Sequence, residues 1–182
     1  SNYAFSNASG VTANISKATI SSVSNVGVNN KTYDGSATAT LTGTATFSGI
    51  IGADSLTVAG NGEFSDKNAG TGKSVGVSGL TLGGADVGNY TLPSTTSSGV
   101  ASITQKALTV TGVTAASRDY DGTRDAVLSG GALSGLVSGE TLNLDLTNQT
   151  GVFADKNAGS GKVVTVTGAT ISDGATGLAS NY

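Results

Sequence analysis

Apolar side chains recur at every second position along several short segments of this chain. Residues 37–47 alternate small apolar groups with threonine, and residues 142–147 alternate leucine with asparagine, aspartate and threonine. A period of two places the two sets of side chains on opposite faces of a strand. Shorter segments of the same kind lie at residues 56–58, 75–77, 108–110 and 164–166. Threonine and valine favour strands, and no helical period is sustained, so we expect almost no helix.

Turn-forming residues separate these segments at short intervals. Glycine, of which the chain has 28 residues, asparagine, aspartate and serine lie between the apolar runs, as antiparallel strands joined by tight turns require. This pattern predicts an all-β fold of antiparallel sandwiches. The alternative all-β architecture is a parallel β-helix, whose coils repeat every ~20 residues. The clear period of this chain is several times longer, so the sandwich is the prediction.

Three short motifs recur in the same order, which divides the chain into two copies of one unit. They are Tyr-Asp-Gly, Asp-Lys-Asn-Ala-Gly and Asn-Tyr. A long period of this kind is typical of a tandem array in which each unit is a domain. The motif residues that we single out as structural are Tyr33, Asp34, Gly35, Asp66, Asn68, Gly70 and Tyr90 in the first copy, and Tyr120, Asp121, Gly122, Asp155, Asn157, Gly159 and Tyr182 in the second.

The boundaries of the units are set near two similar strand junctions, at Lys17 and Lys106. With these boundaries, residues 1–16 are the closing strand of a preceding repeat, residues 17–105 are one module, and residues 106–182 are a second module without a closing strand. We then expect residues 11–16 to pair with an open sheet edge, for instance that of a neighbouring molecule. Starting the units at Asn2-Tyr3 and Asn89-Tyr90 would instead give two complete repeats, and the sequence leaves both choices open.

The Tyr-Asp-Gly motif is predicted to form a turn. The aspartate can accept hydrogen bonds from its own turn, the glycine permits a positive φ, and the tyrosine ring packs inward. The alternative function is a Ca²⁺ site in which Asp119 and Asp125 join Asp121. The first copy has Lys31 and Thr32 where the second has Arg118 and Asp119, and this difference favours the turn.

The other two motifs are also predicted to be structural. Asp66–Gly70 and its second copy form a loop before a strand, and Phe64 and Phe153 lie before them as core residues. Because Lys67 and Asn68 are adjacent, they cannot face each other as an isopeptide crosslink demands. Tyr90 and Tyr182 begin closing strands, where a tyrosine usually packs, although an exposed ring could stack on a sugar. The aromatic fraction of 5% is low for a lectin.

Composition excludes several classes of chemistry. The chain has no cysteine and no histidine, so disulfides, thiol catalysis and the usual catalytic triads are excluded within it. Its net charge of −3, without a basic stripe, argues against nucleic acid as a partner. No apolar run is long enough to cross a bilayer, and the first residues are not a signal peptide. We expect neither an enzyme nor a cofactor, and an internal piece of a longer protein.

Taken together, the Tyr-Asp-Gly turn, the Asp-Lys-Asn-Ala-Gly loop, the Gly-Asn-Tyr strand start at Gly88 and the junction at residues 103–110 resemble the YDG and MBG repeat modules of large bacterial secreted adhesins. This resemblance implies tandem immunoglobulin-like β-sandwiches at the outer cell surface, in proteins that resemble filamentous haemagglutinin. It also implies a role in attachment, aggregation or biofilm formation, and no catalytic residue.

Two functions from different classes follow as expectations. The first is a structural stalk whose partners are the neighbouring repeats of the same chain. The second is a carbohydrate-binding module for an exopolysaccharide or a host glycan.

Overall fold

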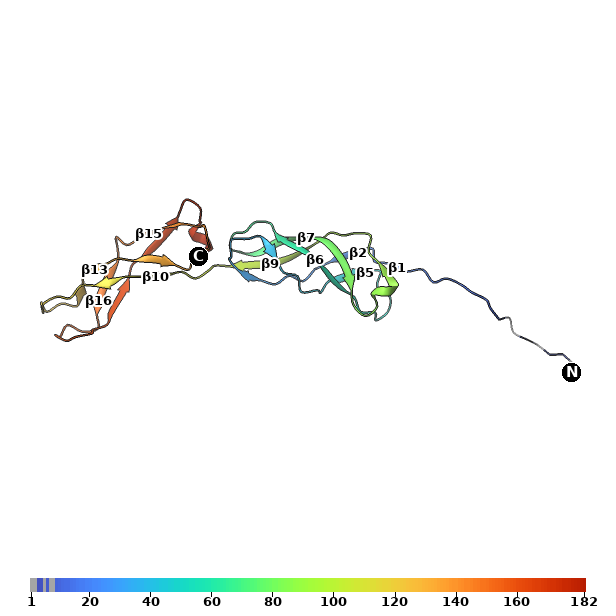
Figure 1. Cartoon of the computed structure of the whole chain (residues 1–182), viewed down its shortest axis with the longest axis horizontal. Helices are drawn as coiled ribbons and strands as arrows, with labels where there is room; N and C mark the ends of the chain where they lie inside the picture. Colours follow the sequence, from blue (N-terminus) through green and yellow to red (C-terminus); the bar gives the residue numbers. More distant parts are fainter. Residues whose placement is uncertain (1–2, 5, 7–8) are drawn as a thin grey trace.

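The computed structural model describes residues 3–4, 6 and 9–182, and the fold is almost entirely β. Figure 1 shows the first repeat, residues 17–105, and the second repeat, residues 106–182, one after the other along the long axis. The described helical segments are two short 3₁₀ turns, η1 (Val87–Asn89) and η2 (Ala179–Asn181), and none is long or apolar enough to span a membrane. The near absence of helix predicted from the sequence is therefore confirmed.

The largest sheet lies in the first repeat and has the strand order β3-β9-β7-β6-β4. Its strands are β3 (Lys31–Thr32), β4 (Thr38–Ala39), β6 (Thr57–Phe64), β7 (Gly70–Gly83) and β9 (Ser97–Thr104). The long strands β6, β7 and β9 pair antiparallel, although η1 and β8 lie between β7 and β9 in the sequence. The β3–β9 pair is parallel, and it joins segments that are far apart in the sequence.

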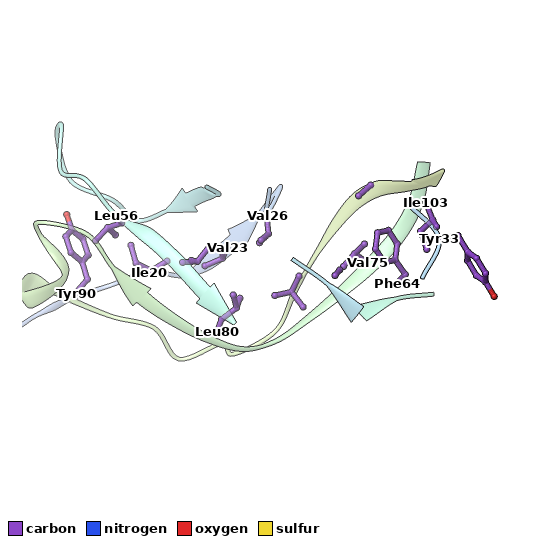
Figure 2. Close-up of a cluster of buried hydrophobic side chains, with 14 residues drawn as sticks. Ile20, Val23, Val26, Tyr33, Leu56, Phe64, Val75, Leu80, Tyr90 and Ile103 are labelled. Atoms are coloured by element: carbon purple, nitrogen blue, oxygen red, sulfur yellow. The ribbon is translucent and has the colours of Figure 1, made fainter. Parts of the chain in front are cut away.

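Two smaller sheets complete the first repeat. The strands β2 (Ser22–Ser24) and β5 (Thr46–Ser48) pair antiparallel, and β1 (Ala18–Thr19) and β8 (Tyr90–Thr91) pair parallel. The core is one cluster of apolar side chains that includes Ile20, Tyr33, Phe64, Val75 and Ile103, all at most 3% exposed (Figure 2).

The single strand predicted over residues 37–47 is wrong. This segment contains β4, an isolated bridge at Leu41 and β5, and its two strands belong to different sheets. Gly43 lies between them with a φ of 83°, a conformation that breaks the pleat and that glycine adopts without strain. The alternation of small apolar groups with threonine continued across the break, so the period alone did not reveal it.

The second repeat repeats only part of this plan. Its strands are β10 (Thr109–Thr111), β11 (Thr114–Ala115), β12 (Asp125–Ala126), β13 (Leu128–Ser129), β14 (Ala132–Ser134), β15 (Leu142–Asp145), β16 (Thr150–Phe153), β17 (Val164–Thr167) and β18 (Thr170–Asp173). They pair as β10-β14, β11-β13, β15-β18 and β12-β16-β17. The last of these sheets corresponds to β4-β6-β7, and within the described chain no strand takes the place of β9 beside β17. Strands lie at the predicted positions 108–110, 142–147 and 164–166, as β10, β15 and β17, but β15 ends at Asp145, two residues before the predicted end.

The residues before the first repeat remain outside every described sheet. Residues 11–16 form no strand, and Val11 and Ile15 are 83% and 100% exposed. The pairing expected for this segment does not occur within the chain. Residues 1–2, 5 and 7–8, which include part of the expected closing strand and Asn2 of the alternative repeat start, lie outside the described residues.

Candidate functional site at the contact between the repeats

Asp34 organises the turn that carries Tyr33. Its Oδ1 accepts hydrogen bonds from the backbone N–H of Ser36, 2.9 Å away, and from Nζ of Lys31, 2.8 Å away. Burial on its own would raise the pKa of the Asp34 carboxyl, but these hydrogen bonds outweigh it and lower the pKa. Gly35 follows with a φ of 81°, which a residue with a side chain adopts only under strain.

The second copy of the turn is built in the same way. Asp121 Oδ1 accepts hydrogen bonds from the backbone N–H and the hydroxyl of Thr123, and its carboxylate forms an ion pair with Arg118. The backbone hydrogen bond from Thr123, followed by the contact with Arg118, lowers the pKa of Asp121 to about 2. The carboxylate that the calcium alternative required is thus engaged by its own turn and by a cation. Among the described residues no group of three acidic side chains converges on one point.

The Asp-Lys-Asn-Ala-Gly segments form a second pair of equivalent turns. Asp66 Oδ1 accepts the backbone N–H of Asn68 at 2.8 Å and an ion pair from Lys73 at 2.6 Å. Asp155 does the same with Asn157 and Lys162. These contacts fix the direction of the residues between the aspartate and the glycine, which therefore project from one end of each repeat.

At the other end of each repeat, a tyrosine hydroxyl is held by an acidic side chain. Tyr90 donates to Asp54 Oδ2 at 2.6 Å and accepts the backbone N–H of Ile51 at 2.9 Å. Tyr182 donates to Glu140 Oε2 at 2.8 Å and accepts the backbone N–H of Val137 at 2.9 Å. The Asn-Tyr motif is therefore part of a loop contact that is the same in both copies.

The end of the first repeat that carries the Tyr33 turn and the Lys67 loop contacts the Tyr182 end of the second repeat. Tyr33 is 2% exposed, and its hydroxyl donates to Glu140 Oε1 at 2.5 Å. Lys67 Nζ reaches the same Oε1 at 2.7 Å and lies 6.0 Å from the centre of the Tyr33 ring. The ring of Tyr182 packs edge-on against Tyr33, with 5.5 Å between the centroids. One carboxylate of the second repeat thus accepts hydrogen bonds from both repeats.

A second set of hydrogen bonds crosses the same contact. Asn181 is 1% exposed, and its Oδ1 accepts the backbone N–H of Ala69 at 2.9 Å. Its Nδ2 donates to Asn68 Oδ1 at 3.1 Å. The backbone oxygen of Asn181 accepts the N–H of Lys106 within the second repeat. A buried amide whose oxygen and nitrogen are both hydrogen-bonded across the contact favours one relative placement of the two segments.

Gly35 lies at a close approach in this contact. A Cβ atom added at Gly35 would come within 2.8 Å of Val137 Cγ1 of the second repeat. Val137 and Tyr182 both pack against the core cluster of the first repeat. The contact is thus a small extension of that core as well as a polar network.

The network holds Glu140 ionised although its side chain is only 7% exposed. Burial alone would raise the pKa of the Glu140 carboxyl, but hydrogen bonds from Lys67, Tyr33 and Tyr182 outweigh burial and lower it. The hydrogen bond to Glu140 raises the pKa of Lys67. Burial, followed by the hydrogen bond to Glu140, raises the pKa of Tyr33. The contact therefore combines one anion and one cation with neutral hydroxyls over a wide range of pH.

Comparison with known proteins assigns the repeats. The sequence model of the YDG domain matches the chain twice, over residues 12–98 and 104–182. The chain belongs to the YDG domain family. No curated protein and no solved structure matches it. The structure therefore shows where the recurring residues of two YDG copies lie, and at the contact between them these residues meet.

The sequence did not indicate Glu140, which accepts hydrogen bonds from both repeats at the contact. A signal was present, because Asp54 occupies the corresponding place in the first YDG repeat, in a segment that reads Gly-Ala-Asp-Ser-Leu against Ser-Gly-Glu-Thr-Leu. An acidic residue that recurs at the same loop position in both copies is a recurring residue like those of the three motifs, and this recurrence could have identified it. The lysines Lys73 and Lys162, which hold the loop aspartates, also recur.

The structure does not bring all the motif residues to the contact. Tyr120, the second copy of Tyr33, is 63% exposed, and Ile51, the first copy of Val137, is 62% exposed. Tyr120 and Ile51 lie away from the contact between the repeats. Each is the exposed counterpart of a residue, Tyr33 or Val137, that is covered at this contact.

Proposed function

We propose that these YDG repeats are immunoglobulin-like sandwich modules that form a structural stalk in a bacterial cell-surface adhesin. The stalk is extracellular and serves attachment, aggregation or biofilm formation. Its partners are neighbouring repeats of the same chain, and it carries no catalytic residue or cofactor. The observation that supports this proposal best is that the recurring residues Tyr33, Lys67, Asn68, Asn181 and Tyr182 lie at the contact between repeats.

A spacer requires a joint that resists bending, and the contact has the features of one. Glu140 and Asn181 are both buried and hydrogen-bonded across the two repeats. Changing the angle between the repeats would break these bonds and leave buried polar groups unpaired, at about 1–3 kcal/mol for each. A sequence that repeats the contact residues in each unit therefore produces a row of units with a fixed angle between them.

A glycan-binding module would instead expose its recurring aromatic rings. Tyr33 and Tyr90 are 2% and 4% exposed, and the hydroxyls of Tyr90 and Tyr182 are bonded to acidic side chains. Tyr3, which is 96% exposed, repeats the Asn-Tyr motif ahead of the first repeat. Within the two repeats, only Tyr120 combines a recurring position with an exposed ring, at 63%. Its counterpart Tyr33 is covered by the next repeat, so in a tandem array a following repeat would cover Tyr120 in the same way.

Small-angle X-ray scattering and a glycan screen test the proposal together. A stalk predicts a rod-like scattering profile for the full chain and no saturable glycan binding, with or without Ca²⁺. A globular profile together with measurable affinity for a sugar, lost in a Tyr120→Ala variant, would replace the stalk with the carbohydrate-binding function.

A further inference from the structure

The first and the last segment of the first repeat lie side by side and run in the same direction. The strand β1 pairs parallel with β8 at the start of the two segments, and β3 pairs parallel with β9 at their end. Partner residues are separated by 72 positions in the sequence at both ends. Residues 18–33 and residues 90–104, which we call the terminal segments, are therefore aligned along the whole repeat.

Hydrogen bonds also join the terminal segments between these two pairs of strands. Ser97 Oγ donates to the backbone oxygen of Val23 at 2.7 Å, and the backbone N–H of Ser102 donates to Asn30 Oδ1 at 2.7 Å. At Gly99 the two backbones approach closely, because an added Cβ would lie 2.5 Å from a backbone oxygen of the first segment. The contact thus continues from one end of the repeat to the other.

Buried side chains from both terminal segments belong to the same core cluster. Ile20 and Val26 of the first segment are 0% and 2% exposed, and Ala101 and Ile103 of the last are 5% and 2% exposed. Sliding one segment along the other would move these side chains out of a closely packed core, which yields little to such a displacement. It would also break the pairing of β2 with β5.

The chain enters and leaves the repeat at opposite ends of this contact. Figure 1 shows β1 at the end of the first repeat that is far from the second repeat, and β9 running to the end that contacts it. Tension along a row of repeats therefore pulls the two terminal segments in opposite directions, parallel to their length. All the bonds between the segments are then loaded together, whereas pulling the segments apart at one end would load the bonds one after another.

The second repeat begins with the same kind of contact. The backbone N–H of Lys106 donates to the backbone oxygen of Asn181 at 2.9 Å, and Gln105 Nε2 donates to the backbone oxygen of Ser180 at 3.1 Å. The next residue, Tyr182, is the second copy of Tyr90, where β8 begins. Tension that leaves the first repeat through β9 thus reaches the second repeat through equivalent residues.

We propose that the terminal segments of the first YDG repeat form a clamp that bears tension along the stalk. The repeat resists force along this direction more strongly than force across it. The inference rests on the proposed stalk for the direction of the load, and it adds a function, the transmission of pulling force, that a spacer alone does not require.

Single-molecule force spectroscopy in two pulling directions tests the clamp, because the chain has no cysteine of its own and handles can be placed at will. The full-length double variant Lys17→Cys/Gln105→Cys is pulled along the terminal segments. In the full-length double variant Lys17→Cys/Ala85→Cys both handles lie at the β1 end of the repeat, so the force peels β1 from β8. All three positions are exposed.

We expect an unfolding force at least about twofold higher along the segments than in the peeling direction at one pulling speed, because forced unfolding is governed by the unfolding rate. Urea unfolding of the two double variants should coincide with that of the unmodified chain. A difference in force then reflects the direction of pulling and not a difference in stability.

One hydrogen bond within the clamp provides a second test. Ser97→Ala removes the donor to the backbone oxygen of Val23, and it should lower the unfolding force along the segments. It should leave the peeling force unchanged, because peeling first breaks the β1–β8 pair. Ser98→Ala, an exposed substitution on the same strand, is the control and should change neither force.

Equal unfolding forces in the two directions would overturn the proposal. So would a Ser97→Ala variant that unfolds like Ser98→Ala along the segments, or that loses the same force in both directions. The stalk function would survive each of these results, since the scattering profile tests it separately. A globular scattering profile would instead contradict the stalk and leave the ratio of the two forces unchanged.

Discussion

At the scale of single residues, the recurring motifs have two roles, in turns and in the contact between the repeats. The sequence predicted the first role but not the second. The aspartates of the turns contact groups within a few residues of themselves, and turn chemistry of this kind can be read from a local sequence. The roles of Tyr33 and Asn181 depend on partners in the other repeat, and no local pattern identifies such a partner. The role of Glu140 was not predicted for the same reason, because its hydrogen-bond donors Tyr33, Lys67 and Tyr182 come from three separate segments.

Gly35 and Gly122 form a matched pair for testing the contact. Both have a φ of 81°, so alanine is strained to the same extent at either position. Only at Gly35 would the new Cβ meet the other repeat, at 2.8 Å from Val137, whereas nothing lies within 4 Å at Gly122. We expect Gly35→Ala to lower the free energy of unfolding by about 1–3 kcal/mol more than Gly122→Ala, the usual cost of overpacking. Urea unfolding of both variants measures the difference, and equal losses would show that the contact yields without cost.

The ionisation of Glu140 makes the stability of the contact depend on pH. The pKa of its carboxyl in the folded chain is below the ordinary value of 4.5. The ionised carboxylate therefore contributes its full stabilisation of the folded chain above pH 4.5. This stabilisation is lost as the pH falls through the lower pKa of the folded state. We expect Glu140→Gln to destabilise the chain at pH 7 by about 1–3 kcal/mol, because Lys67 loses its ion pair and a charged acceptor is removed.

The difference between the wild type and Glu140→Gln should shrink as the pH falls below 4.5. Other carboxylates with lowered pKa, such as Asp66 and Asp155, affect both proteins equally and cancel in this difference. Glu63→Gln, an exposed substitution in the first repeat, is the control and should follow the wild type. Urea unfolding at a series of pH values makes the comparison, and a difference that persists unchanged at acid pH would contradict the assigned role of Glu140.

At the scale of elements, period and turn residues predicted strands but not their partners. The strands at residues 142–147 and 164–166 were predicted because each alternates within one sheet. Residues 37–47 were misread because two strands of different sheets share one alternation across Gly43. The parallel pairs β1–β8 and β3–β9 were not predicted, since each joins segments far apart in the sequence whose pairing is set by the whole fold.

Hydrogen exchange should separate the equivalent strands β7 and β17. In the first repeat, β7 lies between β6 and β9, and residues 73–77 pair with one or both of these strands. Within the described chain, β17 pairs only with β16. An amide without a partner strand exchanges from the native state with little opening. We expect amides on the unpaired side of β17, at residues 162–166, to exchange at least tenfold faster than those at residues 73–77 in dilute solution. Equal protection at low concentration would mean that the unpaired edge of β17 is covered by other means.

At the scale of the whole molecule, the joint combines rigid polar contacts with a chain connection that continues almost directly from β9 into the second repeat. Residues 105–108 leave little length for a hinge. The backbone N–H of Lys106, at the start of the second repeat, donates a hydrogen bond to the backbone oxygen of Asn181. Because every neighbour in a tandem array presents the same two ends, the angle at one joint is repeated at the next. A small set of residues at each contact can therefore determine the shape of a much longer assembly.

Spin labels on either side of the joint measure its rigidity directly. Val100 in the first repeat and Val127 in the second are 65% and 70% exposed, so labelled cysteines at these positions leave the packing intact. The buried Glu140 network predicts one narrow distribution of distances between the labels in dilute solution. Glu140→Gln should broaden it because Lys67 and Tyr33 lose the charged acceptor that fixes their positions, whereas Glu63→Gln should not change it. A broad distribution in the wild type would show that the repeats move independently, and the polar network would then stabilise one of several arrangements without defining a stiff stalk.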